Sequence, residues 1–151
     1  MKLKRYIITI AVMMATLLPT TASAQNVVTP KLYMFGFAAS FNDTIVHFTD
    51  IQTLDSVWVN KKTNFLLARD VYSNMLRNYL ATQQQPYRTC VVFYDRKLKK
   101  LQKKYLKMKK LYEGSKRSKV KNNNDIRIIP TSDFKFTVIN LGVPIEEEVE
   151  E

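Results

Sequence analysis

Residues 95–113 read DRKLKKLQKKYLKMKKLYE and directly follow a short apolar run at residues 89–94, TCVVFY. On a helical wheel of about 100° per residue, apolar side chains recur here at spacings of three and four and form one continuous stripe. The pattern predicts an amphipathic helix that covers one side of a core. Asp95 suits its N-cap, and Gly114 suits the stop at its C-terminus. The stripe consists of Leu98, Leu101, Tyr105, Met108 and Tyr112.

The remaining sides of this predicted helix are dense in lysine. Between residues 96 and 121 there are 13 lysines and arginines against one acidic residue, Glu113. One interpretation is a solvated outer face whose lysine stems cover apolar surface. The other is a surface that binds something anionic, because like charges four residues apart cost helix stability. The candidate binding residues are Lys99, Lys100, Lys103, Lys104, Lys107, Lys110, Lys116 and Arg117.

The first 24 of the 151 residues have the features of a secretory signal peptide. Three basic residues lie among the first five, a largely apolar run of 13 residues follows at 6–18, and small residues occupy 22–24. A run of 13 is shorter than the roughly 20 residues that span a membrane, so we expect cleavage after Ala24 and no transmembrane segment afterwards. The mature chain would be periplasmic or secreted. Losing three basic residues would lower its formal net charge from +11 to +8.

Residues 32–51 show the pattern of a β-hairpin. Residues 32–41 are rich in aromatic side chains and suit the first strand. Residues 42–43 suit a two-residue turn, and residues 44–51 suit the second strand. If Phe41 opposes Thr44, the aromatic residues share one face, and a smaller, mixed set lies on the other, as in a sheet covered on one side only. The aromatic face then holds Tyr33, Phe35, Phe37, Ala39, Phe41, Val46 and Phe48, and the mixed face holds Met34, Gly36, Ala38, Ser40, Ile45, His47, Thr49 and Ile51.

The complete order of predicted elements is strand, strand, helix, strand, helix, strand, strand. A second amphipathic helix is predicted at about 65–82, and further strands at 87–94, 125–129 and 134–141. The order predicts a single α/β (α+β) domain over residues 32–141. We expect a two-layer sandwich: a mixed sheet of about four or five strands that starts with a hairpin, and two helices on one face. The alternative is a fully covered three-layer sheet, which the small mixed face of the first hairpin argues against.

The two ends of the mature chain are expected to lie outside this domain. Residues 25–31 suit a flexible lead-in. Residues 142–151 suit a disordered acidic tail, because five of the last six residues are glutamates. These glutamates could fold back on the lysines in competition with a ligand, or could simply keep the chain soluble.

The sequence predicts no catalytic residue, metal ligand or cofactor. His47 is the single histidine and is expected on the hairpin surface, whereas the single cysteine, Cys90, is expected in an interior strand, free or bridged to another chain. A Cys–His pair is therefore not favoured. Asp43 and Asp50 have opposite parity on a strand, so they cannot join His47 around one ion without a bulge. Three glycines in the whole chain rule out a glycine-rich phosphate loop.

Four stretches stand out as a combination: the ASA site at 22–24 with the glutamine after it, YMFGFAASFNDTIVHFTDIQ at 33–52, FLLARDVYSNMLRNYL at 65–80 and RTCVVFYD at 88–95. Together they resemble small exported proteins of Bacteroidota that carry no assigned activity. The resemblance covers about residues 32–141, implies an exported location, and transfers no functional residue.

Taken together, these features favour an exported, non-enzymatic binding or interaction protein of the cell envelope. Its basic helix face would bind an acidic partner: a protein, a polysaccharide or a lipid headgroup. Lysine outnumbers arginine there, which favours diffuse attraction over bidentate recognition. Nucleic acid is not favoured, because an exported protein rarely meets it. The alternative is a small envelope hydrolase or thiol enzyme with an unrecognised site. The oligomeric state stays open.

Overall fold

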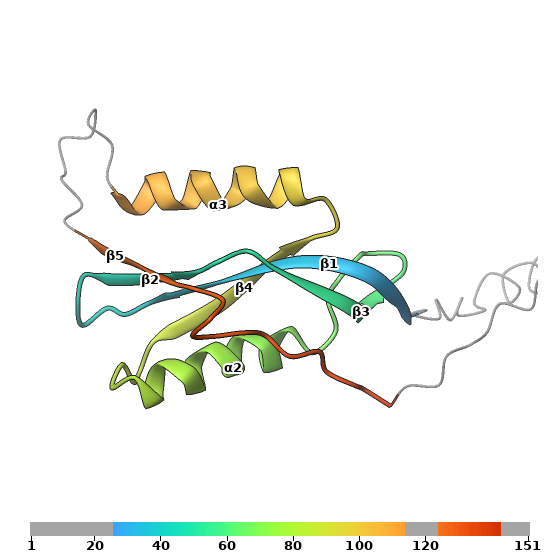
Figure 1. The fold of residues 1–151 in the computed structure, drawn as a ribbon, viewed down its shortest axis with the longest axis horizontal. Coiled ribbons are helices and arrows are strands. Elements are labelled where there is room, and N and C mark those ends of the chain that lie inside the picture. The colour runs from blue at the N-terminus through green and yellow to red at the C-terminus, as the bar shows by residue number, and fades with distance from the viewer. Residues whose placement is uncertain (1–25, 114–123, 143–151) are drawn as a thin grey trace, which may run out of the picture.

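The computed structural model describes residues 26–113 and 124–142 of the chain. The expected signal peptide, the candidate binding residues Lys116 and Arg117, and the acidic tail from residue 143 onward lie outside these ranges. The described elements, shown in Figure 1, are β1 (Asn26–Ala39), β2 (Ile45–Thr49), β3 (Gln52–Asn60), α2 (Arg69–Thr82), β4 (Thr89–Asp95), α3 (Leu98–Glu113) and β5 (Asp125–Ile129).

The long strand β1 organises the sheet. Its N-terminal part pairs antiparallel with β3, its C-terminal part pairs antiparallel with β2 and β4, and β5 adds to β2 in parallel. The predicted fold class is therefore confirmed: an α/β domain with a mixed five-stranded sheet that opens with a hairpin, and two helices.

The hairpin register is the predicted one. Phe37 lies opposite Phe48 and Ala39 opposite Val46, which continues the expected pairing of Phe41 with Thr44. Farther along, Met34 pairs with Gln52, so the register has moved by one residue. Strands β2 and β3 therefore form one return strand interrupted by a β-bulge, which changes the face that later residues occupy.

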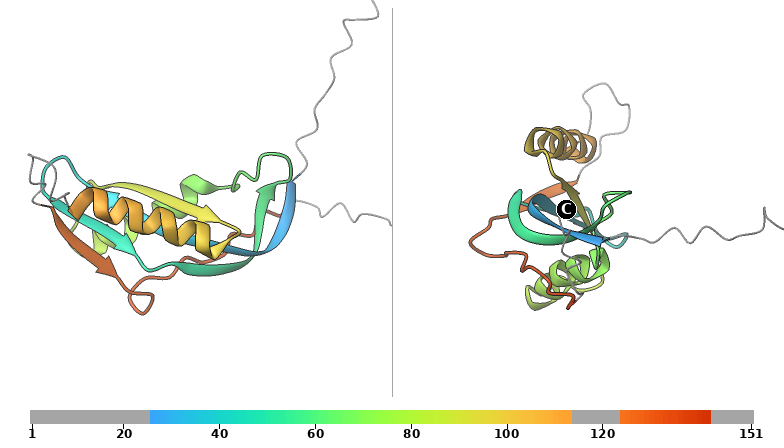
Figure 2. Two further views of the ribbon diagram at one scale, coloured as in Figure 1. Left: turned by 90° about the horizontal axis from the view of Figure 1, so that it is seen from above. Right: turned by 90° about the vertical axis from the view of Figure 1, so that its right-hand side faces the viewer.

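The two helices lie on opposite faces of the sheet, and this corrects the expected placement on one face (Figures 1 and 2). The aromatic face of β1, with Phe35 and Phe37, packs against α3. The mixed face, with Met34 and Ala38, packs against α2. The small residues allow close approach of a helix: a Cβ added to Gly36 would lie 2.6 Å from a methyl group of Leu76 in α2.

The predicted lead-in is part of the sheet. Residues 26–31 belong to β1, and Val27 and Val28 pair with Val59 and Trp58 of β3. Such β-branched and aromatic cross-strand pairs stabilise a ladder. Pairing continues on both sides of Pro30, at Thr29 and Lys31, so the proline does not interrupt the strand.

The second helix is shorter than predicted. It begins at Arg69, because Ala68 adopts a left-handed conformation with φ 51°. Leu66, two residues before Ala68, is fully buried and forms an isolated bridge with Val59 of β3. The apolar residues at the start of the predicted helix thus belong to a loop that closes the core. The buried face of α2 is formed by Tyr72, Leu76 and Leu80.

The C-terminal segment 130–142 begins with a turn at 131–133 and does not form the predicted strand at 134–141. It crosses the mixed face beside α2 and buries Phe134 and Phe136 there. The Gln52 side chain takes the place of a neighbouring strand: its Nε2 donates to the Phe134 carbonyl (2.8 Å), and its Oε1 accepts from the Phe136 N–H (2.8 Å). A side-chain amide thus satisfies backbone groups that would otherwise be buried without partners.

Candidate functional site

Helix α3 is fixed to the sheet by aromatic packing. The Tyr105 ring meets Phe35 edge-on at 5.0 Å between centroids, and the Tyr112 ring lies 4.9 Å from Phe37. Leu101 is fully buried, whereas Leu98, the first residue of the predicted stripe, is 37% exposed. Edge-on aromatic pairs add about 0.5–1.5 kcal/mol each beyond area burial. One side of α3 is therefore buried in the core, and this packing fixes the orientation of the helix on the sheet.

This packing turns six lysines of α3 outward. We call Lys99, Lys100, Lys103, Lys104, Lys107 and Lys110 the α3 lysine face; all six are exposed. At about 100° per residue, four of them, Lys99, Lys103, Lys107 and Lys110, lie directly opposite the buried stripe. The predicted candidates inside the described ranges are thus brought together on one surface.

Few of these charges are compensated locally. The Lys100 ammonium pairs with Asp95 at 3.1 Å, and the Lys104 ammonium lies 4.5 Å from the centroid of the Phe93 ring. The other pair on the helix joins Lys109, outside this set, to Glu113 at 3.7 Å. Within residues 26–113 and 124–142, the four outermost lysines make no ion pair.

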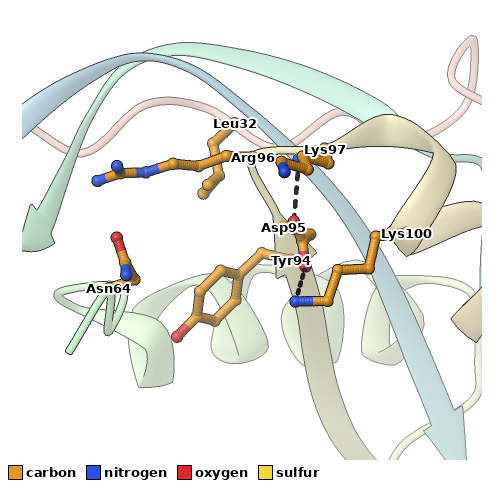
Figure 3. Close-up of a pocket in the computed structure, with 7 residues that line it drawn as sticks. All are labelled: Leu32, Asn64, Tyr94, Asp95, Arg96, Lys97 and Lys100. Carbon is orange, nitrogen blue, oxygen red and sulfur yellow. Dashed lines mark hydrogen bonds and ion pairs between the residues drawn. The ribbon is translucent and has the colours of Figure 1, made fainter.

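A pocket of about 350 Å³ lies where β4 passes into α3 (Figure 3). Asp95 shapes its polar wall, accepting the Lys97 N–H at 2.9 Å and pairing with Lys100. Burial alone would raise the pKa of the Asp95 carboxyl, but these contacts with Lys97 and Lys100 lower it below its ordinary value. The carboxylate therefore stays ionised and holds Lys100 in place.

The opposite side of the same pocket carries the cationic side chain of Arg96. Figure 3 shows the Arg96 guanidinium on the side of Asn64, away from the Asp95–Lys100 pair, with the Tyr94 ring between them. The Tyr94 hydroxyl accepts the Leu66 N–H at 2.9 Å, which fixes the ring. Arg96 and Lys97 were not among the predicted binding residues, because a helical wheel does not show that the strand end and the Asn64 loop enclose the head of the helix.

The structure corrects the position of His47 but does not create a Cys–His pair. His47 is only 5% exposed, not on the surface as expected, and it shares the mixed face with Cys90. Both residues pair with Ala38 of the strand between them, which places their strands about 10 Å apart. The Cys90 thiol instead contacts the Arg88 carbonyl at 3.7 Å.

Neither side chain is activated for catalysis. Burial raises the pKa of the Cys90 thiol despite nearby Arg77 and Arg88, so the nucleophilic thiolate is disfavoured. Burial and the positive charges of Arg88 and Arg127 lower the pKa of His47 to about 4, so its imidazole is neutral at pH 7. Among the described residues, no three histidine, cysteine or acidic side chains gather as a metal site.

Comparisons of the chain with protein-family models, with curated proteins and with solved structures give no match. In the part of the chain that the structure describes, no helix is both long and apolar enough to cross a membrane.

Proposed function

We propose that this protein is an exported, non-enzymatic binding domain of the cell envelope and that its α3 lysine face binds an acidic partner. One observation carries the proposal: four exposed lysines project from the outer side of a helix whose inner side is packed into the core, and none has an ion pair among the described residues. Their mutual repulsion is relieved when an anionic surface covers them.

The chemistry of the face indicates the kind of recognition. Lysine ammonium groups are strongly hydrated point charges on flexible stems, which suit attraction to repeated negative charges. The pocket at the head of α3 adds Arg96, whose planar guanidinium can hold one carboxylate or phosphate group in bidentate fashion. The proposal is therefore a diffuse lysine surface with one geometrically defined anion position at its N-terminal end. Export rests on the signal-like residues 1–24.

The test compares two variants of residues 25–151 on an immobilised polyanion, heparin, eluted with a salt gradient. The first replaces Lys99, Lys103, Lys107 and Lys110 with Gln. The control also removes four exposed charges, by replacing Lys31, Lys62, Arg77 and Lys135 with Gln. Gln and Lys have nearly equal helix propensities, so α3 should persist.

We expect the first variant to elute at clearly lower salt than the control, because binding that depends on ion contacts weakens steeply as salt rises. Equal shifts for the two variants would show that net charge alone governs retention, which would contradict the proposal. A pull-down from envelope extract with the same pair of variants would then identify the acidic partner.

A further inference from the structure

Two aromatic side chains project fully from the end of the sheet that carries the β1–β2 turn. Phe41 is 102% exposed and Tyr87 is 89% exposed, the highest values among large hydrophobic residues in the described part of the chain. Neither ring contributes to a core cluster. Single exposed apolar side chains are common, but two exposed rings at one end of a sheet can form a contact surface.

The two residues belong to neighbouring loops. Ala39 and Thr89 form the last pair between β1 and β4, and Phe41 and Tyr87 each lie two residues beyond that pair. Figure 1 shows the β1–β2 turn and the α2–β4 connection at the same end of the molecule. An ion pair of 2.8 Å between Asp43 and Arg88 joins the two loops.

Both loops are held rigidly although their aromatic rings are free. The Arg88 side chain is only 2% exposed, and it also donates to the Ile45 carbonyl at 2.8 Å and to the Gln85 side chain at 3.1 Å. Gln84 and Tyr87 adopt left-handed conformations with φ 58° and 61°. Non-glycine residues adopt such conformations at an energetic cost, which is often found at ligand sites.

The charge on these loops differs from that of the rest of the chain. In residues 40–44 and 81–89 the only charged side chains are Asp43 and Arg88, and these neutralise each other. The formal net charge of the whole chain is +11. These two loops therefore offer no free charge to an acidic partner, and the neighbouring Asp125 and Arg127 also pair with each other at 2.9 Å. Apart from Ala81 and Pro86, the other side chains of these segments are amides and hydroxyls, including Ser40, Asn42, Thr44, Thr82, Gln83 and Gln84.

From these observations we infer that the two loops form a binding site for a neutral saccharide. Aromatic rings offer flat apolar faces that stack on the C–H faces of sugar rings, and the tyrosine hydroxyl adds a polar edge. Amides and hydroxyls both donate and accept hydrogen bonds, as sugar hydroxyls require. The rigid loops keep the entropic cost of binding low. This inference does not depend on the α3 lysine face.

The test measures retention of residues 25–151 on three insoluble neutral polysaccharides, a β-glucan, a mannan and chitin, at about 1 M NaCl, where the Debye length is about 3 Å and charge attraction is screened. The main variants are Phe41→Ala and Tyr87→Asn, because Asn tolerates a left-handed backbone. Phe41→Trp keeps an aromatic face. Leu111→Ala removes another exposed apolar side chain, 67% exposed, from a different surface.

We expect binding to at least one of the three polysaccharides. Phe41→Ala and Tyr87→Asn should each weaken it about tenfold, while Phe41→Trp, Leu111→Ala and the four-lysine Gln variant of α3 should retain it. Absence of binding to all three materials would overturn the inference. So would binding that survives both loop substitutions together, or aromatic-dependent binding to phosphatidylcholine vesicles without binding to any polysaccharide.

Discussion

Replacing Arg88 with methionine should destabilise the fold strongly, although Arg88 belongs to a loop rather than to a core cluster. The substitution keeps a long side chain but removes the guanidinium. The acceptors left behind are the Ile45 carbonyl, the Gln85 side chain and the Asp43 carboxylate. These three groups then lose the contact that joins the β1–β2 turn to the connection between α2 and β4.

The size of the effect follows from the burial of each acceptor. A buried acceptor left without a donor costs about 1–3 kcal/mol. The Asp43 side chain is 40% exposed, so water can replace Arg88 there at little cost. The Ile45 carbonyl and the Gln85 side chain are less accessible, and together they set an expected loss of about 2–4 kcal/mol in the free energy of unfolding. That is a large share of the about 5–15 kcal/mol typical of a domain.

The assay is urea unfolding of residues 25–151, followed by the fluorescence of Trp58, the only tryptophan, which is 8% exposed in the fold. Asp43→Ala leaves a buried guanidinium without its counterion and should cost a similar amount. Because both substitutions remove the same contact, the double variant should lose at least about 1 kcal/mol less than the sum of the two. An Arg88→Met protein within about 0.5 kcal/mol of the wild type would refute this reasoning.

Three further predictions concern the mixed face of the sheet. Gly36→Ala should destabilise the protein by about 1–3 kcal/mol in the same urea assay, because the new Cβ would meet Leu76 at 2.6 Å; an unchanged midpoint would show that α2 moves away easily. Cys90 is 6% exposed and burial raises the pKa of its thiol, so a thiol reagent at pH 8 should label it only as fast as the chain opens; rapid labelling of the folded protein would contradict its burial. The pKa of His47 is about 4 in the fold against 6.5 for the free side chain, so the unfolded state binds the extra proton; stability should be complete above pH 6.5 and fall by up to about 3 kcal/mol towards pH 4. The variant His47→Asn should not show this loss of stability between pH 6.5 and pH 4. Identical pH profiles for the variant and the wild type would refute the role of His47.

The hairpin register could be predicted from the sequence, because two independent patterns in residues 32–51 agree. Alternation of aromatic residues and a short polar turn both require Phe37 opposite Phe48, and the structure has that pair. The apolar stripe of α3 was also predicted correctly from Leu101 to Tyr112. Phe41 broke the pattern: it has the right parity for the aromatic face but lies beyond the last paired residues.

The placement of α2 could not be predicted in the same way. Gly36 and Ala38 made one face look too small to be a core, yet small residues are what lets a helix approach a sheet closely. The bulge after Thr49 could not be predicted from the sequence either. There the Gly36 N–H donates to the side-chain Oγ1 of Thr49 at 2.8 Å and not to a backbone carbonyl. Neither feature has a local sequence signal.

Only part of the candidate site could be predicted from the sequence, for a related reason. Periodicity along one helix predicted the α3 lysine face, because that surface belongs to a single element. The pocket at its head needs Asn64, from a loop about 30 residues earlier, to lie beside Arg96. Similarly, Phe41 and Tyr87 become neighbours only through the pairing of β1 with β4. Sites assembled from distant segments require the topology to be known first.

Strand β1 has a consequence for how this protein unfolds. Its successive side chains enter two separate cores, Phe35 under α3 and Met34 under α2, and neither core can lose the strand alone. The two helices are coupled without touching each other, because both pack on β1. The domain should therefore melt in a single cooperative transition, and backbone amides in the middle of β1 should be the last to exchange with deuterium.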